Sequence, residues 1–109
     1  MFCNSGNCQQ ISREVISIRD ALIEDIVMDQ RNMIVTISYR VLDNRRPVNR
    51  TLSLIVSGLT VIKDSRGRTV SPRNLRFGMR IHALVSTAMT RSIPPQTRAF
   101  LITVLEEQQ

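Results

Sequence analysis

The stretch that decides the fold runs from residue 60 to residue 105. It begins TVIKDSRGRTVSPRNLRFGMRIHALV (60–85), passes through the polar segment STAMTRSIPPQTR (86–98) and ends in AFLITVL (99–105). Short runs of alternating apolar residues are separated by turn-forming residues, a pattern typical of antiparallel strands. Gly67 suits a tight turn because, without a Cβ, it adopts positive φ freely. We predict strands over 60–62, 79–85 and 99–105.

One helical or 3₁₀ turn is predicted over residues 72–77. Ser71 can cap free backbone amides, Pro72 favours the first helical position, and Gly78 suits the residue just beyond the end. The apolar side chains of this segment, Leu75 and Phe77, are expected to fill the core.

Two further strands are predicted earlier in the chain. Residues 33–41 and 51–57 each alternate between apolar and polar side chains, as half-buried strands do. Residues 43–49 contain Asp, Asn and Pro and are expected to form a turn or short loop between them. Such a short connection indicates antiparallel neighbours.

Residues 12–30 fit two structures. Val15, Ile18, Leu22 and Ile26 have helical spacing, whereas the many β-branched residues favour a strand. Because the rest of the chain reads as β, we favour one long or broken strand, bent near Asp20 and Ala21, that ends in a hairpin turn at 29–32.

Together these elements predict an all-β fold, a small antiparallel five- or six-stranded OB-like barrel with one short helical turn near residues 72–77. The length of 109 residues suits a single domain. We assign residues 11–109 to the barrel and residues 1–10, rich in Asn, Gln, Ser and Gly, to a flexible tail.

Five residues lead from the predicted helical turn into the next strand, in the order Leu75-x-x-Gly78-Met79-x-Ile81-x-Ala83. Through this step, and the Gly-containing turn before it, residues 60–105 resemble a family of small bacterial OB-like β-barrel domains of unknown function. The resemblance implies a five- or six-stranded barrel and brings no known catalytic residues.

The chain carries a net charge of +6 that is unevenly distributed. Residues 1–29 have a net charge of −3, whereas residues 30–105 carry thirteen basic side chains against two acidic ones. Fourteen of the fifteen basic residues are Arg, whose planar guanidinium pairs well with phosphate. OB-type barrels bind oligonucleotides through a basic groove with aromatic stacking platforms. Ten arginines are candidates for such a groove: Arg45, Arg46, Arg50, Arg66, Arg68, Arg73, Arg76, Arg80, Arg91 and Arg98.

Two alternatives to nucleic-acid binding remain open. The arginines can form an ordinary solvated surface, all the more because aromatic residues are few and Tyr39 and Phe77 read as core. The chain can also associate with itself, since residues 99–105 are apolar on both faces of their predicted strand and the acidic segment 14–29 complements the basic remainder.

Enzymatic chemistry has little support in the sequence. His82 is predicted on the outer face of its strand, and neither a Gly-x-Ser-x-Gly elbow nor a Gly-rich phosphate loop is present. Cys3 and Cys8 lie in the predicted tail, where zinc or intermolecular pairing is a minor alternative, so we expect no metal and no cofactor.

We therefore expect a non-enzymatic binding module, with nucleic acid as one possible partner and a second copy of the chain as the other. Apolar runs fall short of the roughly 18 residues needed for a membrane span, and the N-terminus lacks the pattern of a secretion signal. These features predict a cytoplasmic protein without a membrane partner.

Overall fold

The computed structural model describes residues 14–105, within which the chain forms six strands and one 3₁₀ turn. In chain order the elements are β1 (Val15–Asp29), β2 (Asn32–Asp43), β3 (Arg46–Val56), β4 (Val61–Lys63), η1 (Pro72–Asn74), β5 (Arg80–Ser86) and β6 (Gln96–Val104).

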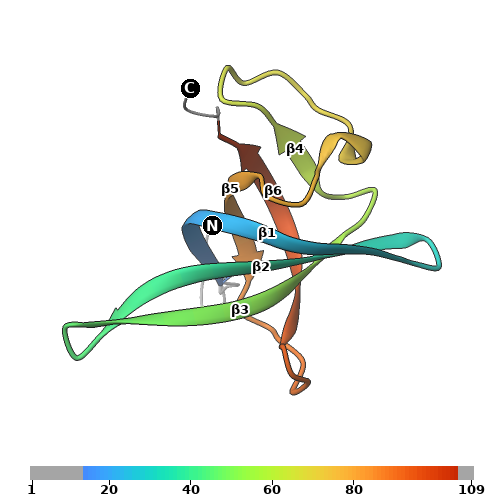
Figure 1. Ribbon diagram of the computed structural model, residues 1–109. Coiled ribbons are helices and arrows are strands. Elements are labelled where there is room, and N and C mark those ends of the chain that lie inside the picture. Colours follow the sequence, from blue (N-terminus) through green and yellow to red (C-terminus); the bar gives the residue numbers. More distant parts are fainter. Residues whose placement is uncertain (1–13, 106–109) are drawn as a thin grey trace, which may run out of the picture.

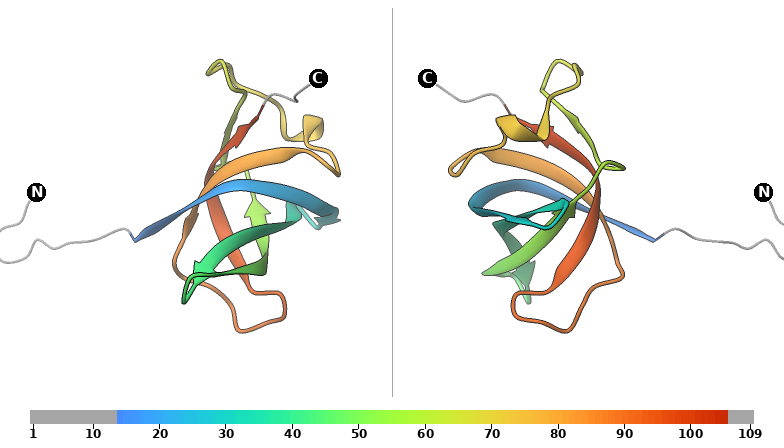
Figure 2. Two further views of the ribbon diagram at one scale, coloured as in Figure 1. Left: turned by 60° about the vertical axis from the view of Figure 1, so that its left-hand side comes forward. Right: turned by 90° about the vertical axis from the view of Figure 1, so that its right-hand side faces the viewer.

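Five of the strands close into a barrel (Figures 1 and 2). β1, β2 and β3 form an antiparallel meander, and the first half of β1 also pairs with β5, which pairs with β6. β6 then returns alongside β3 in parallel, from Ser53–Gln96 to Ile55–Arg98, and completes the barrel. β4 is added outside, parallel to β6. The predicted OB-like barrel is confirmed; the two parallel pairings were not predicted.

β1 is the long bent strand expected for this segment. Its pairing shifts register twice, between Ile18 and Ala21 against β5 and between Ile23 and Asp25 against β2. Each shift is a bulge that moves the inward position by one residue, so the core-facing residues follow intervals of three and two. A bulged strand therefore imitates the spacing of a helix, which explains the ambiguity of this segment in the sequence.

The barrel interior is filled by aliphatic side chains from all five of its strands, joined by Ile62 of β4 and by Leu75. The largest fully buried ones are Ile23, Ile37, Leu52, Leu54, Ile62, Ile81 and Ile102. On β3 the predicted inward positions 52, 54 and 56 are all buried, whereas on β2 the inward face predicted for 33, 35, 37, 39 and 41 is buried at 35 and 37 and half-buried at the other three.

The β2–β3 connection is much shorter than predicted. Only Asn44 and Arg45 form the turn, with φ values of 55° and 68°, and pairing continues outward to Asp43–Arg46. Two residues with positive φ match the twist of paired strands, so the strands continue to the tip. Pro47 fits within β3 because that part of the strand pairs only with β2, and a proline is tolerated at a free edge.

The helical turn forms where expected, but one of its core residues was wrongly predicted. The Arg73 N–H donates to the Ser71 hydroxyl at 3.2 Å, and Leu75 is buried. Phe77, however, is 74% exposed. Gly78 N–H donates to the carbonyl of Ile23, whose own N–H donates to the carbonyl of Met79. This pairing with β1 turns Met79 toward the core in place of Phe77.

The segment between β5 and β6 is tied together by hydroxyl groups. Thr90 and Ser92 hydroxyls lie 2.6 Å apart, and Thr90 also accepts from the Gln96 N–H at 3.0 Å. The buried Thr97 hydroxyl lies 2.7 Å from the Ser86 carbonyl. At the tip, Ile93 precedes a cis proline and is 98% exposed. The loop thus projects an isoleucine from a hydrogen-bonded base.

The double apolar pattern of the last strand also results from a bulge. β6 shifts register against β5 at Phe100, so the inward positions pass from Thr97 and Ala99 to Ile102. Phe100 and Leu101 are left on the outer side, where Phe100 is 41% exposed.

Candidate nucleic-acid interface

An open cleft of about 520 Å³ lies on the outer side of the barrel wall. We call it the outer cleft; its lining residues are Arg19, Asp20, Leu22, Ser38, Tyr39, Arg40, Asn49 and Arg80. They come from the consecutive strands β1, β2 and β3 and from β5, which is distant in sequence.

The cleft lies where two strands separate. β1 and β2 are paired from the hairpin turn as far as Leu22–Ser38, after which β1 turns away to pair with β5. β2 instead continues with β3 to Asp43–Arg46, and Figure 1 shows this β2–β3 hairpin extending beyond the barrel. The separation exposes Arg40 and Asn49 on one side of the cleft and Arg19 on the other.

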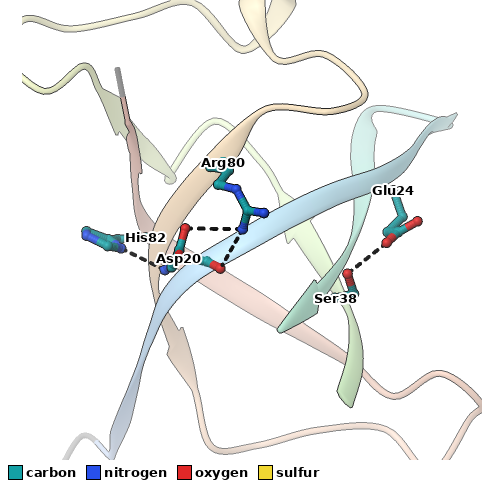
Figure 3. Close-up of polar contacts among 5 residues, drawn as sticks. All are labelled: Asp20, Glu24, Ser38, Arg80 and His82. Atoms are coloured by element: carbon teal, nitrogen blue, oxygen red, sulfur yellow. Dashed lines mark hydrogen bonds and ion pairs between the residues drawn. The ribbon is translucent and has the colours of Figure 1, made fainter. Parts of the chain in front are cut away.

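The bulge of β1 at Arg19 and Asp20 is held by two side chains of β5 (Figure 3). The Asp20 N–H donates to Nδ1 of His82 at 3.0 Å. Arg80 Nη1 donates to the Asp20 carbonyl at 3.4 Å and pairs with its carboxylate at 3.2 Å. Asp20 has a φ of 55°, which Asp tolerates better than most residues. His82 and Arg80 therefore satisfy the backbone and side chain of the bulge and fix one wall of the cleft.

The other two arginines of the cleft have no carboxylate partner among residues 14–105. Arg40 Nε donates to Oδ1 of Asn49 at 3.3 Å, and the Arg19 side chain makes no hydrogen bond or ion pair within that range. Near the opposite wall, the Ser38 hydroxyl donates to Glu24 at 2.7 Å (Figure 3). Arg19 and Arg40 are thus the cations of the cleft that are available to an anion.

Aromatic side chains contribute little to the cleft. Tyr39 lines it but packs against the core, as the sequence indicated. The exposed Phe77 belongs to a separate hollow of about 550 Å³, which it shares with Asn74, Arg76, Gly78 and Met79. Met79 lines this hollow, and the next residue, Arg80, lines the outer cleft.

The ten arginines predicted from the sequence lie in five places. Arg45, Arg46 and Arg50 lie on the β2–β3 hairpin, where the Arg50 guanidinium lies 3.9 Å from the Asp43 carboxylate. Arg66, Arg68, Arg73 and Arg76 belong to the segment between β4 and β5, Arg91 to the β5–β6 loop and Arg98 to β6. Arg80 alone of the ten lines the outer cleft. The prediction omitted Arg19 and Arg40, although the alternation of residues 33–41 already placed Arg40 on the outer face.

Asp64 organises the turn after β4. Its carboxylate accepts the N–H groups of Arg66 and Arg68, each at 2.9 Å, and Nε of Arg68 at 3.1 Å. The bond from the Arg68 backbone N–H is the largest of the contributions that lower the pKa of Asp64 below its ordinary value. The Asp64 carboxylate therefore partly neutralises the positive charge of Arg68 within this turn.

Within residues 14–105, no cluster of three or more His, Cys, Asp or Glu side chains is suited to a metal ion. In the same range, no helix is long and apolar enough to cross a membrane. Cys3, Cys8 and the predicted tail lie outside the described residues. Comparison of the chain with models of protein families, with curated proteins and with solved structures finds no match.

Proposed function

We propose that this chain is a non-enzymatic binding module that takes single-stranded nucleic acid in the outer cleft. The observation that carries the proposal is the presence of Arg19 and Arg40, free of carboxylate partners in the described chain, on opposite walls of one cleft. In OB-type barrels the face of the second and third strands is the surface that meets oligonucleotides. Arg40 and Asn49 lie on those two strands here.

The β2–β3 hairpin carries three further arginines near the cleft. Arg50 is opposite Tyr39 and Arg46 is opposite Asp43, so both lie on the face of the hairpin away from Arg40 and Asn49, whereas Arg45 lies in the turn. A nucleic-acid backbone that wraps around this hairpin from the cleft would meet these cations together with one acidic side chain, Asp43, which Arg50 approaches. Binding by phosphate contacts, with little stacking, agrees with the scarcity of exposed aromatic residues on this face.

The salt dependence of binding tests the proposal. Fluorescence anisotropy with a labelled oligonucleotide of about 12 residues is measured over a range of salt concentrations. Arg19→Gln and Arg40→Gln should each reduce the slope of log K against log salt by about one contact, because one released counterion is lost. The triple replacement of Arg45, Arg46 and Arg50 by Ala should reduce it further.

Arg73→Gln is the matched control, since it removes the same charge from exposed η1, outside the cleft. It should leave the slope unchanged. If Arg73→Gln weakens binding as much as Arg19→Gln, the arginines act only through net charge and the cleft is not the site. The absence of any complex with single- or double-stranded DNA or RNA at low salt would overturn the function itself.

A second candidate function, a homo-oligomeric structural module, has an observation of its own. The outer faces of β4, β6 and β5 align Val61 opposite Leu101 and Leu101 opposite Leu84, so that these side chains form a continuous apolar row. Phe100 and the 85% exposed Leu59 flank this row. Exposed apolar surface of this kind is typical of an interface between proteins.

Light scattering of the purified protein at high micromolar concentration tests this candidate. Self-association should be abolished by Phe100→Asp, which places a charge in the apolar row, and retained in Leu42→Asp. Leu42 is similarly apolar and 76% exposed, but it lies on the β2–β3 hairpin. A wild-type protein that is strictly monomeric would exclude the oligomer. Under either candidate function, we also propose that the chain belongs to the family of small bacterial OB-like β-barrel domains and that it is located in the cytoplasm.

A further inference from the structure

His82 is the side chain on β5 that accepts the backbone N–H of the β1 bulge. Its Nδ1 lies 3.0 Å from Asp20 N, so the neutral imidazole carries its proton on Nε2. A protonated imidazole has a hydrogen on both nitrogens and can accept none. Protonation would therefore bring two N–H donors face to face at the bulge and break this bond.

The bulge is also the wall of the outer cleft that carries Arg19. Asp20 and Arg19 both line the cleft, whereas His82 does not. Once the His82 bond is lost, Arg80 supplies the remaining side-chain contacts of the bulge, through the Asp20 carbonyl and carboxylate, between the flanking backbone pairs Ile18–Ala83 and Ala21–Ile81. The position of Arg19 thus depends on a contact made outside the cleft.

The charged groups around His82 come from three strands. β1 supplies Asp20 and its neighbour Arg19, and β5 itself supplies Arg80. On the other side His82 is opposite Thr103 of β6, which is in turn opposite Lys63 of β4. A positive charge on His82 would join three cations and one carboxylate, whose Oδ1 is already paired with Arg80.

We propose that His82 is a positioning residue that makes the outer cleft sensitive to pH. Its neutral form holds the bulge at Asp20 and so presents Arg19 to an anionic ligand, and its protonated form releases the bulge. The proposal rests on the proposed function for its ligand, but the release of the bulge occurs without ligand. His82 is the only histidine of the chain, and histidine is the side chain that ordinarily changes charge between about pH 5 and pH 8.

NMR of the wild-type protein without ligand provides the first test. As the pH falls from about 7.5 to about 5.5, the amide resonance of Asp20 should shift along the same titration curve as the imidazole protons of His82. In His82→Asn, whose Oδ1 replaces Nδ1 as an acceptor but does not titrate, the Asp20 amide should not move. If the Asp20 amide resonance of the wild-type protein does not shift when His82 is protonated, the proposal is wrong for any ligand.

Binding of the labelled oligonucleotide provides the second test. Over the same pH range, wild-type affinity should fall by about fivefold, the ratio expected for one neutral hydrogen bond. His82→Asn should bind equally well at both pH values, and His82→Phe, which has no acceptor, should bind weakly at both. If His82→Asn keeps the pH dependence of the wild type, His82 is not its source. If no oligonucleotide binds at any pH, the proposed function fails while the NMR result still decides the role of His82.

Discussion

At the scale of single residues, the Asp64 carboxylate acts on the backbone, whereas that of Asp20 pairs with the Arg80 side chain. Asp20 and Asp64 both lie where the chain departs from regular strand geometry, and both engage an arginine nearby. Asp64 is the simpler case, because it accepts two backbone N–H groups within its own turn. Such bonds favour the ionised carboxylate, which accounts for its lowered pKa.

Asp64 should therefore contribute stability that depends on pH. Because its pKa is lower in the folded protein than in the unfolded one, the contribution is complete above the unfolded value and disappears as the pH falls through the folded value. Asp64→Asn should lower the thermal midpoint at neutral pH and have no effect in strong acid, as measured by circular dichroism. Asp29→Asn serves as the control, since the Asp29 side chain makes no hydrogen bond or ion pair within residues 14–105. An equal loss at every pH would contradict the electrostatic explanation.

At the scale of elements, the sequence predicted strands and turns well and bulges poorly. Alternation identified β2, β3 and β5 because their inward positions keep a constant parity. In β1 and β6 the inward-facing positions change from one face to the other at a bulge, and no residue type indicates a bulge in the sequence. As a result, β1 resembled a helix and β6 appeared apolar on both faces. The same limit applies to the cleft: Arg19 lies in a bulge, and only the pairing of β1 with β5 brings it opposite Arg40.

The β5–β6 loop is the element whose order depends most clearly on one side chain. Thr97 is buried, and its hydroxyl can donate to the carbonyl of Ser86 or to that of Ala88. Thr97→Val keeps the shape but leaves these carbonyls without the donor, at a cost of about 1–3 kcal/mol. Hydrogen exchange of the Thr90 and Gln96 amides, which close the loop, should accelerate by about fivefold or more. Thr97→Ser keeps the hydroxyl and should retain wild-type exchange; similar acceleration in both variants would assign the effect to packing.

At the scale of the whole molecule, the barrel described over residues 14–105 combines three pairings of consecutive barrel strands with two long-range pairings, β1–β5 and β3–β6. The β1–β2 and β2–β3 hairpins and the β5–β6 pair are each formed by consecutive barrel strands. The closing contact differs, because β3 and β6 meet over only three residue pairs, and the first of them, Ser53 and Gln96, are 43 positions apart. That closure could not be predicted from local patterns, since parallel pairing leaves no turn signal in the sequence.

The shortness of this seam has a consequence for how long the folded state lasts. Pairing β3 with β6 closes a long loop at a cost in entropy, and the three residue pairs of this seam offset that cost only when they are complete. The transition state for folding should therefore contain the β1–β2–β3 meander and lack the β3–β6 seam. In stopped-flow kinetics, Ile37→Val in the meander should slow refolding. Thr97→Val at the seam should leave the refolding rate unchanged and accelerate unfolding. If Thr97→Val slows refolding and Ile37→Val does not, the β3–β6 seam closes early in folding. With the expected result, the lifetime of the folded barrel depends on a contact that does not affect the rate of folding.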